Sequence, residues 1–255
     1  MSERNGYEPG VPCWVDTRQP DPRAAADFYT RLFGWEAETS GEYTFCKLRG
    51  SDVAAITAGE RAAWNTHIWV DSADDTAARV SNAGGRVVTA PFDVPAAGRT
   101  AVLADPAGAE FSVWQPAARK GAQRVNEWGA WAMSALSTPD LDGAKAFYGD
   151  VFGWETDTFA LGDLDVTLWR LPGFVGGEPE QPVPADVIAA AAPAGDGPPE
   201  WSVDFWVEDT DTTATRAAEL GGTVIAPPFD IPIGRRAVLA DPQGAAFSIT
   251  RIATP

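Results

Sequence analysis

The sequence GRTAVLADPAGAEFSVW, residues Gly98 to Trp114, returns almost unchanged as GRRAVLADPQGAAFSIT, residues Gly234 to Thr250. Twelve of the seventeen positions are identical. Each copy is typical of a β-hairpin, because an apolar run precedes Asp-Pro-x-Gly, whose proline suits the second turn position, and an alternating strand follows. A hairpin of this kind needs a sheet to join, so two copies predict two similar sheets.

Length and composition agree with two domains. The chain has 255 residues, of which 45% are hydrophobic, and its eleven tryptophans help to fill two substantial cores. The formal charge of −17 argues against nucleic acid and anionic membranes as partners. This acidity favours a cationic or neutral small ligand, although it also serves simply to keep a protein soluble.

The cysteines and the apolar runs predict a location. Cys13 and Cys46 form neither a CxxC pair nor a disulfide framework, which suits a reducing compartment. The first ten residues lack the apolar segment of a signal peptide, and no apolar run approaches the roughly 18 residues of a membrane span. We therefore expect a soluble, cytoplasmic protein.

The strand and helix signals follow the order β-α-β-β-β, and this order repeats. Residues 11–17 alternate like a half-buried strand, and Asp21 then caps a helix that Gly34 ends. Short strand signals follow. A second unit begins with a strand at Trp64, and its helix, capped by Ser72, precedes three more strand signals.

The whole arrangement returns in the second half of the chain. Phe28 matches Phe147, an offset of 119 residues (147 − 28), whereas Gly84 matches Gly221, an offset of 137 (221 − 84). The second half therefore contains an insertion of 18 residues (137 − 119). Residues 172–199, rich in Pro, Gly and Ala, are predicted to be this inserted loop, either as a lid over a pocket or as a plain excursion.

The repeat also gives the domain boundaries. We expect an N-terminal tail (1–10), a first domain (11–115), a linker (116–127) and a second domain (128–251). The linker is polar and locally basic, as segments between domains often are. Each domain is expected to enclose a core of its own, with residues 172–199 outside the common sheet.

Two pairs of motifs carry a resemblance to a known family. They are the helix ends FYTRLFGWE (28–36) and FYGDVFGWE (147–155), and the two GR…DPxGAxFS hairpins. The chain thereby resembles the vicinal oxygen chelate superfamily, which includes glyoxalase I, bleomycin-resistance proteins and extradiol dioxygenases, and it is most similar in arrangement to actinobacterial two-domain glyoxalase-like proteins. The resemblance implies an α+β fold of tandem vicinal oxygen chelate domains, each made of two βαβββ modules that form a cup-shaped sheet.

The resemblance also implies where a metal would bind. Metal-dependent members hold a divalent ion with two histidines and a glutamate on three strands of each cup. The matching positions are Trp14, His67 and Ser112 in the first domain, and Met133, Asp204 and Ser248 in the second. Only His67 keeps the ligand type, with Asp204 as an oxygen donor in the other cup. Because such an ion needs three or four protein ligands, we expect no metal and no other cofactor.

The single histidine strengthens this expectation, since a site of two histidines and one carboxylate needs a second imidazole. A register shift leaves one alternative, because Asp16 shares a face with Trp14 and Glu110 shares a face with Ser112. Asp16, His67 and Glu110 would then form a weak metal-binding set. Without a metal, Asp16 beside His67 would fix the imidazole tautomer and allow acid–base catalysis, whereas the structural alternative is a polar group satisfied within the sheet.

Tryptophans on the expected strands supply candidate pocket walls. Trp69 shares the face of His67, and Trp206 shares that of Asp204. Aromatic walls with few polar groups describe a pocket for a planar organic ligand, and they equally describe a sheet core. The ligand-binding candidates are Trp14, Trp69, Glu110, Ser112 and Trp114 in the first cup, and Met133, Asp204, Trp206 and Ser248 in the second.

Two functions are consistent with these residues. The first is a metal-independent small-molecule-binding protein of the glyoxalase/bleomycin-resistance type, which sequesters an aromatic or cationic metabolite or antibiotic. The alternative is a lyase or isomerase of secondary metabolism or detoxification that uses His67 and Asp16 as a proton relay. We expect a monomer with an internal pseudo-dimer, and a homodimer is the alternative.

The first cup is the expected binding site. Its copy loses the polar set, because Asp16, His67 and Glu110 correspond to Ala135, Asp204 and Ala246. Polar groups are costly to bury, so their retention in one cup alone indicates use. The contrary hypothesis is that Asp204 and Trp206 recognise a cationic ligand in the second cup.

Overall fold

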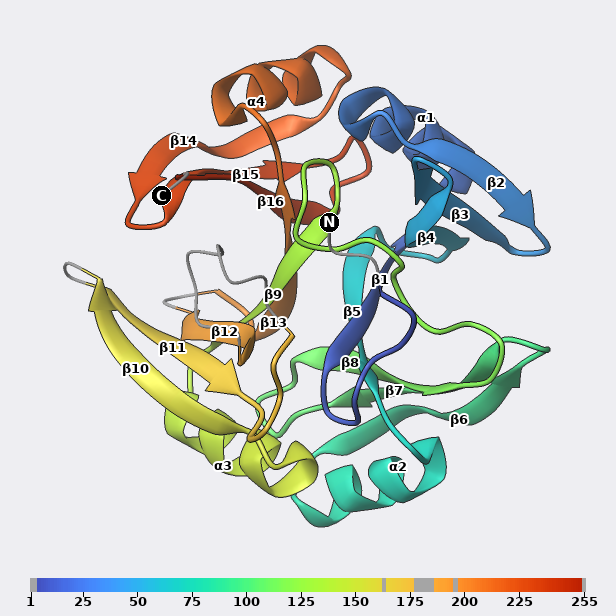
Figure 1. The fold of residues 1–255 in the computed structure, drawn as a ribbon, viewed down its shortest axis with the longest axis vertical. Helices are drawn as coiled ribbons and strands as arrows, with labels where there is room; N and C mark the ends of the chain where they lie inside the picture. Colours follow the sequence, from blue (N-terminus) through green and yellow to red (C-terminus); the bar gives the residue numbers. More distant parts are fainter. Residues whose placement is uncertain (1–3, 162–163, 177–185, 195–196, 254–255) are drawn as a thin grey trace.

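The computed structural model describes residues 4–161, 164–176, 186–194 and 197–253. It contains two eight-stranded sheets, one from each half of the chain (Figure 1). The four helices lie around the outside of the pair of sheets, and the strands that join the two modules of each sheet lie near the centre of the molecule. This arrangement places the middle of each sheet next to the other half.

The first half consists of two modules of the same order. The first module comprises β1 (Pro12–Gln19), α1 (Pro22–Phe33), β2 (Glu36–Ser40), β3 (Tyr43–Leu48) and β4 (Ser51–Ala58). The second comprises β5 (Ala63–Trp69), α2 (Ala73–Asn82), β6 (Arg86–Val94), β7 (Gly98–Ala104) and β8 (Glu110–Pro116).

The second half repeats this order. Its first module comprises β9 (Trp131–Thr138), α3 (Leu141–Phe152), β10 (Glu155–Leu161), β11 (Leu164–Arg170) and β12 (Val187–Pro193). Its second module comprises β13 (Glu200–Trp206), α4 (Thr210–Glu219), β14 (Thr223–Ile231), β15 (Gly234–Ala240) and β16 (Ala246–Ile252).

The strand order is the same in both sheets. The first runs β2-β3-β4-β1-β5-β8-β7-β6 and the second runs β10-β11-β12-β9-β13-β16-β15-β14. In the first sheet β1 pairs in parallel with β4 and β5 in parallel with β8, and the two modules meet where β1 pairs antiparallel with β5. The predicted α+β fold of two cup-shaped sheets, each built from two βαβββ modules, is confirmed.

The repeated helix ends fix where each module turns. Asp21 accepts hydrogen bonds from the first backbone amides of α1, and Gly34 ends this helix with φ of 72°. Asp140 and Gly153 do the same for α3, with φ of 74° at the glycine. Glycine is favoured in this left-handed region, so the FGWE sequences direct the chain into β2 and β10 at equivalent points.

The inserted segment differs from the prediction. Within residues 172–199, Val187–Pro193 form β12, which pairs antiparallel with β11 and parallel with β9. A continuous run of small apolar residues can enter a sheet centre, although the Ala-rich composition of this run resembled a loop. Most of the additional residues therefore precede β12, because Ala190 is the equivalent of Ala55, an offset of 135 residues (190 − 55). Residues 177–185 and 195–196 of the predicted loop lie outside the described part.

The hydrophobic core is shared between the halves. In one cluster Phe28 and Tyr29 of α1 contact Phe247 of β16, with ring centroids 6.4 and 5.7 Å apart. In the other cluster Phe111 of β8 contacts Tyr148 of α3, with centroids 5.7 Å apart. The expectation that each half encloses its own core is wrong, because each of these helices packs against both sheets.

Buried hydrogen bonds also join the two halves of the chain. The Trp64 indole donates to the Tyr29 hydroxyl, which donates to Asp241 in the hairpin of the second half, at 3.0 and 2.9 Å. The equivalent hydrogen bonds in the other direction run from the Trp201 indole to the Tyr148 hydroxyl at 2.8 Å and from this hydroxyl to Asp105 at 3.3 Å. The helix-end motif of one half is thus bonded to the hairpin motif of the other.

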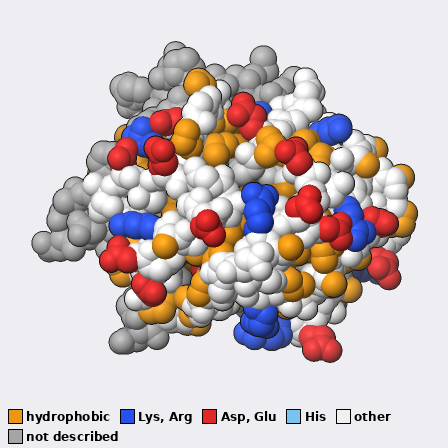
Figure 2. All heavy atoms as spheres, turned by 90° about the horizontal axis from the view of Figure 1, so that it is seen from below, with side chains coloured by type: hydrophobic (Ala, Val, Ile, Leu, Met, Phe, Trp, Pro, Cys, Tyr) orange, Lys and Arg blue, Asp and Glu red, His pale blue; other side chains and the backbone are white. Residues whose placement is uncertain are grey.

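The surface shows how the charge is distributed. Acidic, basic and apolar side chains are interspersed on the face seen from below in Figure 2. In the described part of the chain, no helix is both long and apolar enough to cross a membrane. Cys13 and Cys46 are buried, unpaired thiols.

Candidate functional site

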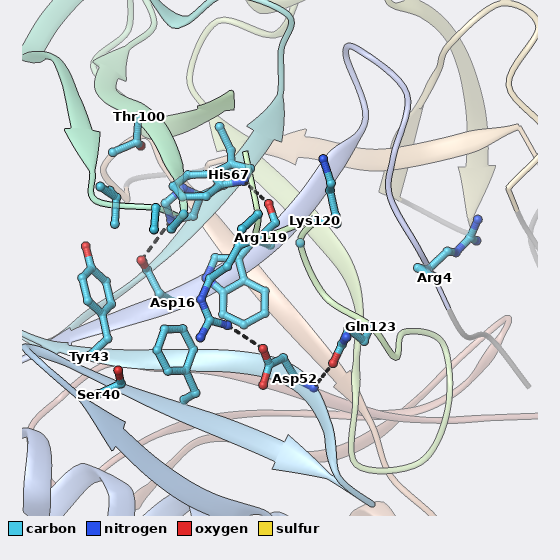
Figure 3. A pocket seen from close by; sticks show the side chains of 18 of the residues that line it. Arg4, Asp16, Ser40, Tyr43, Asp52, His67, Thr100, Arg119, Lys120 and Gln123 are labelled. Carbon is cyan, nitrogen blue, oxygen red and sulfur yellow. Dashed lines mark hydrogen bonds and ion pairs between the residues drawn. The ribbon is translucent and has the colours of Figure 1, made fainter. Parts of the chain in front are cut away.

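A cavity of about 610 Å³ opens on the concave face of the first sheet, which we call the first cup. Its volume lies within the range typical of small-molecule sites. Strands of the first half supply Trp14, Asp16, Tyr43, Phe45, His67 and Trp114, and the predicted linker supplies Arg119 and Lys120 (Figure 3).

Strand register brings three of the predicted positions side by side. Trp14 of β1 pairs with His67 of β5, and His67 pairs with Ser112 of β8. Trp14 and His67 line the cavity, whereas Ser112 is buried beneath it. The three positions implied by the family resemblance therefore lie on neighbouring strands of the first sheet.

His67 and Asp16 form a hydrogen-bonded pair at the cavity floor. The His67 Nε2 atom lies 3.0 Å from Asp16 Oδ2, and the two residues are only 7% and 8% exposed. Asn65 of β5 donates to Asp16 Oδ1 of β1 at 3.2 Å and to Ser112 Oγ of β8 at 2.9 Å. It therefore connects these three strands at the cavity floor. Asn65 was not predicted as a site residue, although strand alternation places it on the face of His67.

The hydrogen bonds determine the charge of the floor. Burial raises the pKa of Asp16, but the contacts with His67 and Asn65 outweigh burial and hold the pKa below its usual value. Asp16 is thus a carboxylate that accepts the Nε2 proton of His67. The opposite nitrogen, Nδ1, is buried without a hydrogen-bond partner among the described residues. His67 Nε2 therefore lies 3.0 Å from both the Asp16 carboxylate and the Asn65 amide nitrogen, which fixes the position of the imidazole at the cavity floor.

Two predicted residues of the first cup lie apart from the cavity. The Trp69 ring packs against Tyr7 of the N-terminal tail, with ring centroids 6.2 Å apart, and does not line the cavity. Glu110 is exposed at the start of β8 opposite Ala104, so the predicted set of Asp16, His67 and Glu110 is not assembled. Strand alternation gives the face of a residue but not its distance from the cup centre, and Glu110 lies too near the strand end.

The segment predicted to be a plain linker forms a wall of the cavity. Backbone amides of Ala117 and Arg119 donate to the Ala97 carbonyl, and the Ala122 amide donates to Cys13 in β1. The Trp114 indole donates to the Arg119 carbonyl at 3.0 Å. Residues 117–122 are thereby fixed against the first sheet, and their basic composition alone did not predict this contact.

The second cup contains a different set of side chains. Arg236 donates to Ser248 Oγ at 2.8 Å and its Nε lies 3.7 Å from Asp204 Oδ1, which also accepts from Thr250 at 2.8 Å. Burial raises the pKa of Asp204, with Arg236 and Thr250 acting in the opposite direction. The candidates Asp204 and Ser248 are therefore bound to protein groups.

Met133 and Trp206 line a much smaller cavity, of about 60 Å³. Trp206 is 8% exposed and packs against Trp128, with ring centroids 6.3 Å apart. A cavity of this size holds a few water molecules at most, far below the volume of a small-molecule site. Trp206 therefore packs against a neighbouring indole, and Met133 lines a cavity too small for an organic ligand.

Comparison with known proteins agrees with this duplicated architecture. A family model described as a glyoxalase-like domain matches residues 14–114 and again residues 132–250. The chain belongs to the glyoxalase-like domain family. It is 39% identical to a protein named putative glyoxylase CFP32 from Mycobacterium bovis, over 98% of each chain. It is also 36% identical to the anthracycline biosynthesis protein DnrV of Streptomyces peucetius, over 96% of this chain and 94% of the relative.

Solved structures share the fold of this glyoxalase-like protein. A Mn(II)-bound glyoxalase from Novosphingobium aromaticivorans superposes with a TM-score of 0.66 at 21% identity, covering 95% of this chain and 82% of the other. The catechol dioxygenase BphC superposes with a TM-score of 0.63 at 13% identity, covering 96% and 87%. At these identities the comparison establishes the fold alone.

The side chains of this family member do not fit the metal that the fold implies. The three aligned positions of the first cup hold an indole, an imidazole and a hydroxyl, and the imidazole nitrogen is bonded to Asp16. Among the described residues, no group of three His, Cys, Asp or Glu side chains could hold an ion. A transition-metal site needs more imidazole, thiolate or carboxylate donors than either cup presents.

Proposed function

We propose that this glyoxalase-like protein is a metal-independent small-molecule-binding protein that sequesters a planar aromatic metabolite in the first cup. The observation that carries the proposal is the cavity of about 610 Å³ with indole and phenyl walls and one hydrogen-bonded His–Asp pair at its floor. Pockets that combine apolar walls with a few fixed polar groups are typical of small-molecule sites. Trp14 and Trp114 offer flat surfaces to a ring system.

The contrast between the cups supports the choice of the first. Arg236 of the second cup occupies the position of Thr100 in the first, since both face the equivalent residue of the last strand. A small threonine leaves room above the floor, whereas the arginine reaches Ser248 and Asp204. The binding volume therefore belongs to the first cup.

The names of the relatives are consistent with a ring-system ligand. DnrV is named for anthracycline biosynthesis, and anthracyclines contain fused rings. A cavity with aromatic walls suits the same chemical class. We therefore include fused-ring secondary metabolites among the ligands of the first cup.

One observation favours a second function, a lyase or isomerase. The His67 imidazole lies against the Asp16 carboxylate at the cavity floor, with 3.0 Å between Nε2 and Oδ2, and an imidazole–carboxylate pair is a common general acid–base arrangement in enzymes. Proton transfer at a carbon or oxygen of the ligand would then turn a binding protein into an enzyme. The two functions share one site and differ in whether the ligand leaves unchanged.

Calorimetric titration with 2-anthracenemethanol, a neutral fused-ring probe, tests the site. Trp14→Ala and His67→Ala should each weaken binding by more than about tenfold, equivalent to 1.4 kcal/mol. Asp204→Ala and Trp206→Ala are the matched changes in the second cup and should leave the affinity unchanged. Circular dichroism confirms that all four variants fold. The reverse ranking would move the site to the second cup, and equal losses would mean that both cups bind.

Mass spectrometry separates binding from turnover. Fused-ring compounds that raise the melting temperature are incubated overnight with the protein and recovered. The sequestering function predicts an unaltered ligand mass and an unaltered chromatographic retention time, the second of which also detects isomerisation. A changed product that His67→Gln fails to form would establish the enzyme instead.

A further inference from the structure

The first cavity does not share the strong negative charge of the chain as a whole. The formal net charge of the protein is −17. The charged residues around the cavity are three cations, Arg4, Arg119 and Lys120, and two carboxylates, Asp16 and Asp52, which gives +1 with His67 neutral (3 − 2). Without Arg4, whose side chain points away from the others, two cations still balance the two carboxylates, so this acidic protein places no net negative charge around its cavity to repel an anionic ligand.

Both carboxylates of the cavity are already engaged. Asp16 accepts hydrogen bonds from His67 and Asn65, and Asp52 Oδ2 accepts from Arg119 Nη1 at 2.6 Å. A cationic ligand would have to compete with these protein donors. The expectation of a cationic ligand, which rested on the overall charge, is therefore not supported by the cavity itself.

Arg119 is the cation best placed to contact a ligand. Figure 3 shows its side chain directed into the cavity between Asp16 and Asp52, whereas the Arg4 side chain points away from this group. The Arg119 side chain is 40% exposed, and its only ion pair among the described residues is with Asp52. A guanidinium has five N–H donors, so groups remain for a second acceptor.

The surroundings hold the Arg119 guanidinium in a fixed orientation. Its central carbon lies 3.5 Å from the centroid of the Phe45 ring. Its backbone amide donates to Ala97 and its carbonyl accepts from the Trp114 indole, at 3.1 and 3.0 Å. A guanidinium stacked on an aromatic face and fixed at its backbone is preorganised for planar, bidentate recognition of a carboxylate.

We propose that the ligand of the first cup is a planar aromatic carboxylate, and that Arg119 of the linker segment binds its carboxylate group. This inference rests on the proposed function, since it names the ligand class of the same cavity. The ring system lies against Trp14 and Trp114, and the carboxylate reaches the guanidinium at the wall. Lys120, which is exposed and has no ion pair among the described residues, adds positive charge at the same wall.

Three probes with one ring system test the ligand class. They are 2-anthroate, 2-anthracenemethanol and 2-(aminomethyl)anthracene, which are anionic, neutral and cationic near neutral pH. We expect 2-anthroate to bind the wild-type protein at least about tenfold more tightly than the alcohol, because a hydrogen bond to a charged group contributes more than a neutral one. The amine should bind most weakly.

Variants of Arg119 show whether this residue carries the preference. Arg119→Gln should lower the affinity for 2-anthroate by about tenfold and leave that for the alcohol within about twofold, whereas Arg119→Lys should keep part of the preference. Arg235→Gln is the matched control, because it removes an exposed arginine that pairs with Asp211 and Asp230 in the second half. It should change neither affinity.

Asp52→Asn gives a prediction of opposite sign. The substitution keeps the side-chain shape but removes the negative charge that competes for Arg119, so the affinity for 2-anthroate should rise about three- to fivefold. A purely structural role of the Arg119–Asp52 pair would instead make both variants weaken all three probes together. The opposite signs therefore separate recognition from structural support.

The outcomes also separate this inference from the proposed function. If the alcohol and the carboxylate bind the first cup equally well, the aromatic site stands and the carboxylate assignment is overturned. If neither probe binds, or if Trp14→Ala has no effect on either, both proposals are overturned. Selective loss of carboxylate binding in Arg119→Gln, with the melting temperature of the variant unchanged, supports the assignment.

Discussion

The two cups have the same backbone and different floors. At equivalent points of the two sheets the first cup carries His67, Thr100 and Trp114, and the second carries Asp204, Arg236 and Thr250. The first set leaves a cavity of about 610 Å³ above a His–Asp pair. The second set is joined by contacts of Arg236 with Ser248 and Asp204. The two halves therefore share the same backbone fold but not the same set of side chains at the cup floor.

The faces of the strands that point away from the cups explain why the backbone fold is preserved. Phe111 and Phe247 occupy equivalent positions, and each packs against a helix of the other half. A change at either position would leave a gap between two modules, so packing restricts it. Side chains on the concave faces meet the cups, where the packing constraint is weaker. The cores should therefore respond alike to substitution, whereas the cups should respond differently.

The largest expected effect tests the equality of the cores. Phe111→Ala and Phe247→Ala should each lower the free energy of unfolding by about 3–5 kcal/mol, because each leaves a cavity among rings from both halves. Urea unfolding followed by circular dichroism measures the loss, and each variant should retain a single transition. Two separated transitions, or a loss confined to one variant, would show that the halves have independent cores.

The next prediction concerns metal binding. Wild-type protein purified without added metal should contain far less than one transition-metal ion per chain, and chelator should not change its melting temperature. The double variant Trp14→His, Ser112→Glu places two histidines and a carboxylate on neighbouring strands, and should bind Zn²⁺ more than about a hundredfold more tightly, equivalent to roughly 2.7 kcal/mol.

The matched control for the metal test is Met133→His, Ser248→Glu in the second cup. It lacks the second imidazole, because Asp204 stands where the first cup has His67, and Arg236 places a positive charge beside it, so its Zn²⁺ affinity should rise much less. Elemental analysis and calorimetry measure both variants. Stoichiometric metal at His67 in the wild-type protein would contradict the proposal and restore Lewis-acid chemistry to the first cup.

A third prediction uses the opposite pKa shifts of the two floor carboxylates. The pKa of Asp16 lies below its usual value, so ionised Asp16 stabilises the fold above about pH 3.9, and this contribution is lost as the pH falls through the lowered pKa. The pKa of Asp204 lies above its usual value, so the fold favours the protonated form, and stability declines as the pH rises from about 3.9 through the raised pKa.

Urea unfolding from about pH 3 to pH 8 measures both effects. Asp16→Asn should cost about 1–2 kcal/mol near neutral pH, with the difference from wild type shrinking in acid. For Asp204→Asn, stability relative to wild type should improve as the pH rises. Asp142→Asn, at an exposed aspartate whose side chain is 98% accessible, is the control and should show neither trend. Parallel trends in the two floor variants would show that the floors do not differ electrostatically.

The smallest expected effect is that of Glu110→Ala. Glu110 is exposed and lies outside the first cavity, so its removal should change the free energy of unfolding by less than about 0.5 kcal/mol. Its effect on the affinity for 2-anthracenemethanol should fall within measurement error. A clear loss of affinity would show that Glu110 belongs to the binding site and that the site extends beyond the lining of the first cavity.

The sequence by itself determined the modules and their repeat. Asp-Pro-x-Gly turns, aspartate caps and the glycines after each helix are local signals, because the turn or cap is satisfied within a few residues of the chain. Strand alternation also placed Asp16 on the face of Trp14, whereas the pairing of Trp14 with His67 followed from the family resemblance. The Ala-rich strand β12 escaped prediction because its composition has no local signal that distinguishes a buried strand from a loop.

Only the tertiary structure decided how the modules pair and what completes the site. Tyr29 is bonded to Asp241, which lies 212 residues later, and no local pattern records which hairpin a helix will meet. Arg119 and Asn65 belong to the first cup for the same reason, since their roles depend on distances to Phe45, Asp52 and Asp16. Contacts between segments far apart in the chain form only when the two sheets pack, so the cavity is a property of their assembly.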